Sequence, residues 1–207
     1  MDEIYITVIE NSEDKKRLVN LLTEYGFVKW GYKKEKESVY IKSLVLDLNK
    51  NVKQNFPLVK WNNVNYYLLP IKPLFNTRLL PDCILKTESP KDYKQNLPWM
   101  NAISKVYIGD NLWQENPKEG DLIIFYITND LQVNAMFRSV ITGIDIVLAK
   151  DKLNLSNLGK ILSLTVFTED EIKKFKNPYC LKFLFLVNFE KRPTLKFLRD
   201  NNLFNGP

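Results

Sequence analysis

Histidine is absent from this sequence of 207 residues. Without an imidazole, the chain has no histidine general base, no Ser-His-Asp or Cys-His nucleophile pair and no histidine-ligated zinc. An enzyme built on this chain would have to use carboxylates, lysine, tyrosine or a cofactor. We therefore assign no catalytic residue and expect no cofactor.

Cysteine is also scarce, and its two occurrences, Cys83 and Cys180, lie far apart in the sequence. This spacing offers neither a pair of metal ligands nor a disulfide framework, so we expect two ordinary thiols and no metal. No apolar run approaches the roughly 20 residues that span a bilayer. The N-terminus lacks the basic segment and apolar stretch of a signal peptide. These features predict a soluble, cytoplasmic protein that does not enter a membrane.

The charge balance is basic but moderate. Thirty Lys and Arg residues face 24 Asp and Glu residues, which leaves a net charge of +6 at pH 7. Such an excess permits binding to nucleic acid, and a lysine-rich solvated surface explains it equally well. Hydrophobic residues make up 45% of the chain and aromatic residues 13%, which is enough for a packed core.

The first 50 residues have the pattern of a small α/β unit. A run rich in β-branched residues predicts a strand over residues 4–9. Asn11 or Ser12 supplies an N-cap for a helix that ends at Gly26. Two further strands are expected over residues 27–32 and 38–44. Residues 51–63 are interpreted as a connecting segment, partly helical, that leads into a second domain.

Residues 64–207 are dominated by strands. Pro70, Pro73 and Pro81 predict an extended, turn-rich passage after a short strand at 64–70. Gly143 within an apolar strand indicates a bend or the close approach of another backbone segment. The other expected elements are a strand or helix end over 101–108, strands over 122–127, 137–148 and 180–188, a short helix capped by Thr168 and a final helix over 193–201. The predicted fold class is an α/β unit followed by a β-barrel with flanking helices.

The first domain carries Tyr25-Gly26-Phe27, Gly31 and the hairpin segment Val39-Tyr40-Ile41-Lys42. Over residues 3–44 this set resembles the C-terminal half of a GNAT-type acetyltransferase. In that family the acetyl-CoA pyrophosphate binds a glycine-rich loop at a helix N-terminus, where bare backbone amides hold anions. This chain has only seven glycines and no such loop, and Leu22 stands where the family often has a tyrosine acid. The resemblance implies a half-domain without its catalytic machinery.

Four motifs follow one another in the second domain: Asn101-Ala102-Ile103-Ser104-Lys105-Val106-Tyr107, Gly120-Asp121-Leu122-Ile123-Ile124-Phe125-Tyr126, Ser139-Val140-Ile141-Thr142-Gly143 and Lys191-Arg192-Pro193-Thr194-Leu195. Their order resembles that of bacterial proteins in which a GNAT segment is fused to a PUA-like domain of the ASCH or EVE type. The resemblance implies a small barrel with a cleft, in a superfamily that binds RNA or modified nucleic-acid bases. One departure precedes Val166-Phe167, where Leu164 or Thr165 replaces a frequent arginine.

Six residues are candidates for contact with nucleic acid: Lys105, Tyr107, Tyr126, Arg138, Thr142 and Arg192. The cations would bind phosphate, while Tyr126 and Thr142 would line a base pocket at the barrel mouth. Structural alternatives exist for several of them. Lys105 could pair with a carboxylate, Arg192 could pair with Glu190 or Asp170, and Tyr126 could pack in the core.

Three functions remain open at this point. The first is a binding module for RNA or for single-stranded or modified DNA. The second is an acetyltransferase-related subunit whose missing half comes from a partner. The third is a protein-interaction subunit of a bacterial or phage toxin-antitoxin or defence system, which forms a homodimer or contacts a protein partner through residues 1–44.

The absent pyrophosphate loop leads to a prediction about acetyl-CoA. The purified chain should show no binding of acetyl-CoA in a calorimetric titration, because neither the anion-binding loop nor a tyrosine at position 22 is present. Micromolar affinity for acetyl-CoA in the isolated chain would contradict the interpretation of residues 3–44 as a non-catalytic half-domain.

Overall fold

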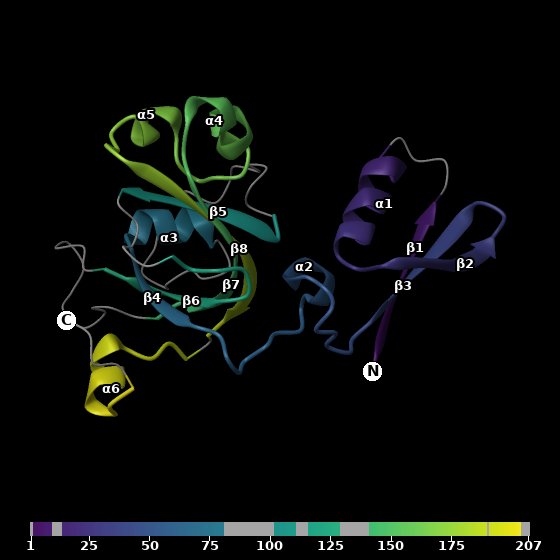
Figure 1. The fold of residues 1–207 in the computed structure, drawn as a ribbon, viewed down its shortest axis with the longest axis horizontal. Helices are drawn as coiled ribbons and strands as arrows, with labels where there is room; N and C mark the ends of the chain where they lie inside the picture. Colours follow the sequence, from purple (N-terminus) through teal and green to yellow (C-terminus); the bar gives the residue numbers. More distant parts are fainter. Residues whose placement is uncertain are drawn as a thin grey trace. The chain divides into compact units, whose positions relative to one another are not determined.

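The structure is a computed structural model that describes residues 2–9, 14–80, 102–110, 116–128, 141–189 and 191–203 (Figure 1). The chain divides into two compact units, Met1–Asn63 and Val64–Pro207. Cys83 and Arg138 lie outside the described residues. Within the described ranges, no helix has both the length and the apolar character needed to cross a bilayer.

The first unit is a three-stranded antiparallel sheet with one main helix. Strand β1 (Glu3–Ile9) is followed by α1 (Lys15–Glu24), β2 (Val28–Lys34) and β3 (Glu37–Ser43), and the sheet order is β1-β3-β2. This order of elements confirms the pattern expected from the sequence. Gly26 ends the helix with φ +83, and a Cβ there would lie 2.6 Å from the Gln54 carbonyl oxygen. Both the backbone angle and the lack of space therefore require glycine.

Residues after β3 are tied back to this sheet by Lys42. The Lys42 side chain is buried, and its ammonium donates hydrogen bonds to the backbone carbonyls of Tyr25 and Phe56. Phe56 directly follows the short helix α2 (Val52–Asn55), which Asn51 caps with its side chain. Burial lowers the pKa of Lys42 to about 8, because removal from water disfavours the charged form. Residues 51–63 thus belong to the first compact unit.

The second unit is built on a five-stranded sheet of order β4-β6-β7-β8-β5. Its strands are β4 (Tyr66–Ile71), β5 (Ser104–Asp110), β6 (Leu122–Ile127), β7 (Gly143–Lys152) and β8 (Pro178–Asn188). Strands β4 and β6 run parallel, and the other neighbouring pairs are antiparallel. The strand predicted over 137–148 is described from Gly143 onward and extends to Lys152.

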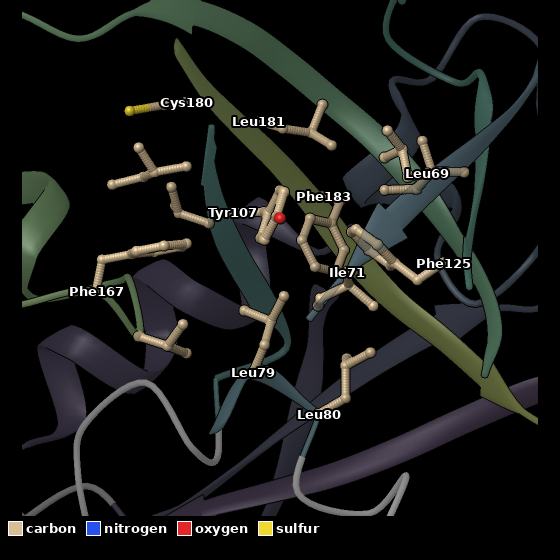
Figure 2. Packing of buried hydrophobic residues seen from close by; sticks show 14 of the residues in the cluster. Leu69, Ile71, Leu79, Leu80, Tyr107, Phe125, Phe167, Cys180, Leu181 and Phe183 are labelled. Atoms are coloured by element: carbon tan, nitrogen blue, oxygen red, sulfur yellow. The ribbon is translucent and has the colours of Figure 1, made fainter. Parts of the chain in front are cut away.

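This sheet curls so strongly that a side chain of one edge strand reaches the backbone of the other edge strand. The Tyr107 hydroxyl on β5 donates a hydrogen bond of 3.4 Å to the Pro70 carbonyl on β4, although these strands lie at opposite ends of the sheet order. The ring of Tyr107 lies 5.5 Å from that of Phe125 and 5.7 Å from that of Phe167. Figure 2 shows these rings together with Phe183 inside the curl. The second unit therefore has a mixed α/β fold around a barrel-like sheet.

In the part of the second unit that the structure describes, four helices accompany the curled sheet: α3 (Pro73–Leu79), α4 (Leu155–Leu162), α5 (Glu169–Ile172) and α6 (Leu195–Asp200). The extended passage predicted around Pro73 is wrong, because residues 73–79 form a helix. Proline occupies the first helical position there, where its missing N–H costs no hydrogen bond. Arg78 of α3 forms a 3.1 Å ion pair with Glu171 of α5, so these two helices are joined directly.

Helix α4 was not anticipated from the sequence. It starts at a reciprocal cap, in which the Asn154 side chain accepts from the Asn157 backbone and the Asn157 side chain accepts from the Asn154 backbone. Its apolar residues Leu158, Ile161 and Leu162 pack on the core of the second unit. Two asparagines in place of the usual Ser/Thr and Glu/Gln made this start signal difficult to recognise.

Gly143 is expected to be sensitive to substitution. A Cβ at this position would lie 2.0 Å from the Val187 carbonyl oxygen on the neighbouring strand, which confirms the predicted close backbone approach. We expect Gly143→Ala to lower the unfolding free energy by about 3 kcal/mol, because β7 and β8 would have to move apart.

Gly159 in α4 offers the matched control, since no atom lies within 4 Å of a Cβ added there. Gly159→Ala should raise the unfolding free energy by about 0.5–1 kcal/mol through helix propensity. Urea unfolding followed by circular dichroism measures both changes, and equal effects of the two substitutions would refute this account.

Candidate functional site

Three strands of the second unit end close to the segment that precedes α6. The Thr142 N–H donates to the Phe125 carbonyl at 3.0 Å, and the Phe189 N–H donates to the Thr142 carbonyl at 3.0 Å. The Ile141 N–H donates to the Pro193 carbonyl, also at 3.0 Å. The ends of β6, β7 and β8 are thereby fixed relative to residues 191–193. Of the six candidate residues, this arrangement brings together Tyr126, Thr142 and Arg192.

An open pocket of about 520 Å³ lies at this end of β8. It is lined by Phe189, Lys191, Arg192, Pro193 and Phe197. Thr194 caps α6, and its hydroxyl accepts from the Phe197 N–H at 3.0 Å, which fixes the backbone that carries the Phe197 ring. That residue is 52% exposed. The residues that line the pocket thus include two with cationic side chains and two with aromatic rings, and Nη1 of Arg192 is itself buried.

Tyr126 and Thr142 contribute to the structure next to this pocket. Along β6, Phe125 and Ile127 are buried in the core, whereas Tyr126 points to the opposite face and is half-buried. Thr142 is 1% exposed, and its hydroxyl donates to the Phe125 carbonyl at 3.3 Å. The Thr142 hydroxyl thus already has a partner within the protein.

Tyr107 belongs to the core of the curled sheet rather than to its surface. It is 8% exposed, and burial raises the pKa of its hydroxyl to about 12. Its ring contacts and its bond to Pro70 are those of a core tyrosine with a hydroxyl partner. The structure therefore separates Tyr107 from the pocket at Arg192.

Lys105 is buried near Asp145, a residue that the sequence analysis did not select as a candidate. Lys105 on β5 pairs with Phe183 of β8, and Asp145 on β7 pairs with Phe185 of the same strand. Because Phe183 and Phe185 share one face of β8, all of these side chains face the inside of the curl. The exposed fractions of Lys105 and Asp145 are only 5% and 2%. The positive charge of Lys105 acts on the Asp145 carboxyl, so the two groups are near each other inside the curl.

The protonation of Asp145 reflects three opposing influences. Burial raises its pKa to about 8, while the backbone N–H of Leu186, at 3.3 Å from Oδ1, and the positive charge of Lys105 act to lower it. Burial is the largest of the three. A signal for this residue was present in the sequence, because a lone carboxylate occurs inside the apolar run Ile144-Asp145-Ile146-Val147. Such a group in a strand core requires polar neighbours.

The ranges that the structure describes contain no cluster of three acidic or cysteine side chains able to hold a metal ion. Cys180 is buried in the core of the second unit, and burial raises the pKa of its thiol to about 11. The thiol is therefore in its protonated form at neutral pH, which is unsuited to metal ligation or nucleophilic attack.

Comparisons with known proteins find matches among solved structures. No protein-family model and no curated protein matches the chain. Crystal structures of two mutant proteins of ZmASCH from Zymomonas mobilis align with 69% of this chain, with a TM-score of 0.45 and 9% sequence identity. The alignments cover 83% and 86% of those two chains.

The buried carboxyl of Asp145 gives a prediction that a carboxyl-carbon NMR titration tests. Asp145 should titrate near pH 8 in the wild type. Lys105→Met should move this titration to higher pH by about 1 pH unit, because the positive charge that favours the carboxylate is removed.

Asp110 is the internal control for this titration. The backbone N–H groups of Lys176 and Asn177 donate to its carboxylate and lower its pKa, and Lys105 is not among the groups that affect it. Its titration should be the same in both proteins. A titration of Asp145 near pH 4 in the wild type would show that its carboxyl is solvated.

Proposed function

We propose that the second unit is a PUA-like module that binds RNA or single-stranded or modified DNA at the pocket lined by Phe189, Lys191, Arg192, Pro193 and Phe197. One observation supports this proposal above the others. Two cations and two aromatic rings line a single open pocket of about 520 Å³. Nucleic acid presents the matching pair of features, a phosphate and a planar base, in every residue of its chain.

The chemistry of the pocket assigns a role to each side chain. The Arg192 guanidinium is a planar fork that binds two phosphate oxygens at once, and the Lys191 ammonium adds a mobile point charge. A base would stack on the ring of Phe197 or Phe189, a contact that tolerates any base because each has a π face. A volume of about 520 Å³ is within the usual range of about 300–1,000 Å³ for small-ligand pockets and has room for one nucleotide.

The other candidate residues take supporting roles in this proposal. Thr142 holds the strand end beside the pocket, and Tyr126 is a flanking side chain on the outer face of β6. Lys105 and Tyr107 maintain the inside of the curled sheet. Arg138 stays a candidate phosphate contact. The first unit is proposed to be a GNAT-derived segment without transferase activity.

Binding should depend on salt and on Arg192. We expect weak association with single-stranded RNA, with a slope of log K against log salt of about −0.7 for each phosphate contact. Arg192→Ala should make this slope less steep by about one contact, whereas Arg192→Lys should keep the slope and lose part of the affinity, because lysine lacks the bidentate fork. Fluorescence anisotropy over a series of salt concentrations measures both quantities.

Phe197→Ala should weaken binding by about 1–3 kcal/mol without changing the slope, since stacking releases no counterions. Arg17→Ala is the control for net charge, because Arg17 is 90% exposed in the first unit. It should leave binding nearly unchanged. Absence of binding to RNA, single-stranded DNA and modified duplex probes at low salt would refute the proposal, as would an effect of Arg17→Ala equal to that of Arg192→Ala.

A further inference from the structure

Strand β8 contains one residue more than its partner β7 close to the end that leads to the pocket. Ile144 of β7 pairs with Val187, and the next residue of β7, Asp145, pairs with Phe185. Between these two pairs, Leu186 is an extra residue of β8 and forms a β-bulge. A bulge disrupts the ladder locally, so the N–H of the extra residue needs an acceptor other than the opposite strand's backbone.

The carboxyl of Asp145 supplies this acceptor. Its Oδ1 accepts a hydrogen bond from the Leu186 N–H at 3.3 Å. Asp145 is 2% exposed, so water has little access to its carboxyl. On the other side of β8, the N–H of Phe185 donates to the Ile103 carbonyl at 3.1 Å. The bulged segment is therefore held by a backbone bond on one side and by the Asp145 side chain on the other.

The bulge reverses the alternation of side chains along β8. Phe185 packs on the core inside the curled sheet. In an uninterrupted strand, residues 187 and 189 would face the same way as residue 185, because alternate side chains share a face. With the extra residue, Val187 pairs with Ile144, whose side chain lies on the face opposite to that of Asp145, and Val187 is 40% exposed. The same shift by one residue puts Phe189 on the outer face, and this residue lines the open pocket.

The segment turned by the bulge leads directly into the pocket. The Phe189 N–H donates to the Thr142 carbonyl at 3.0 Å, which fixes the backbone at this position. Lys191 and Arg192 follow within three residues, and both line the same pocket as Phe189. The face that Phe189 takes therefore also sets where the chain enters the part of the pocket that contains the two cations.

We propose that Asp145 is the positioning residue of the pocket: its carboxyl holds the bulge at Leu186, and the bulge turns Phe189 to the pocket side of β8. Asp145 is not among the residues that line the pocket, so it acts through the backbone of β8. Its effect on affinity rests on the proposed function of the pocket. The bulge and the facing of the strand end can be measured without any ligand.

The charged and titratable groups near Asp145 leave its carboxyl to the bulge. Lys105 of β5 acts on it as a positive charge. Tyr107 lies on the same face of β5, and its hydroxyl already donates to the backbone of β4. Asp121, which precedes β6, accepts from two backbone N–H groups. A carboxylate accepts hydrogen bonds more strongly than a neutral acid does, so loss of the Asp145 proton should be visible at the Leu186 N–H.

The test is amide NMR spectroscopy of the full chain with two substitutions. Asp145→Asn keeps an oxygen acceptor, so hydrogen exchange at the Leu186 N–H and the Val187–Ile144 contact between the strands should stay as in the wild type. Asp145→Leu should speed this exchange about tenfold, the effect of losing one hydrogen bond, and should weaken the Val187–Ile144 contact. In the wild type, the amide shift of Leu186 should follow a titration near pH 8 that is absent from Asp145→Asn.

Asp151→Leu is the matched control. Asp151 is on the same strand, and its ion pair of 2.6 Å with Lys182 lies away from the bulge, so exchange at Leu186 should not change. In anisotropy measurements with single-stranded RNA, Asp145→Leu should weaken binding at least about fivefold, as for the loss of one stacked ring, and Asp145→Asn by less than about twofold.

A wild type that binds no RNA refutes the proposed function, and the exchange and shift measurements still decide the role of Asp145. Normal exchange at Leu186 in Asp145→Leu overturns that role. Fast exchange in Asp145→Asn overturns it too, as does unchanged RNA affinity of Asp145→Leu when the wild type binds. Circular dichroism shows whether each variant folds. If Asp145→Leu does not fold, a Leu186 amide shift in the wild type without a titration near pH 8 decides against the proposal.

Discussion

The curled sheet of the second unit depends on an aromatic cluster that fills its inside. Tyr107, Phe125 and Phe183 come from β5, β6 and β8, and Phe167 comes from the segment between α4 and α5. Contacts between such rings contribute about 0.5–1.5 kcal/mol each beyond the burial of their area. The hydroxyl of Tyr107 reaches the opposite edge strand, so one residue both fills the interior and joins the edges.

The buried charges follow from the same curl. Lys105 and Asp145 lie on strands that are separated by β8, and the alternation of side chains along the paired strands places both on the inner face of the sheet. Burial of a carboxylate without compensation would be costly, and here the raised pKa of Asp145 lets it carry a proton at neutral pH. The interior thus contains a group that changes charge near pH 8, next to the end of the sheet that leads to the pocket at Arg192.

The two units present different chemistry to possible partners. The second unit has a pocket with cations and aromatic rings at the ends of its strands, which suits a nucleotide. The first unit exposes the apolar side chains Ile9, Val28 and Trp30 on its three-stranded sheet.

The sequence by itself determined the local elements of this protein. A β-branched run identified β1, apolar runs identified β6 and β8, Gly26 identified the end of α1, and Thr168 identified the start of α5. These features depend on neighbouring residues and so can be read along the chain. Arg192 was selected as a candidate residue in the same way, because it is a cation that precedes a proline and an expected helix.

Only the tertiary structure decided which residues meet. Helix α3 forms where prolines predicted extended chain, because its buried face packs on the core of the curled sheet. Asp145 becomes the neighbour of Lys105 although 40 positions separate them in the numbering, and Phe189 joins Phe197 in one pocket. Such contacts arise from the order and curvature of the strands, and neither is encoded in a local pattern. For that reason Lys105 and Tyr107, chosen for a surface role, lie in the interior, whereas the aromatic walls of the pocket were not foreseen.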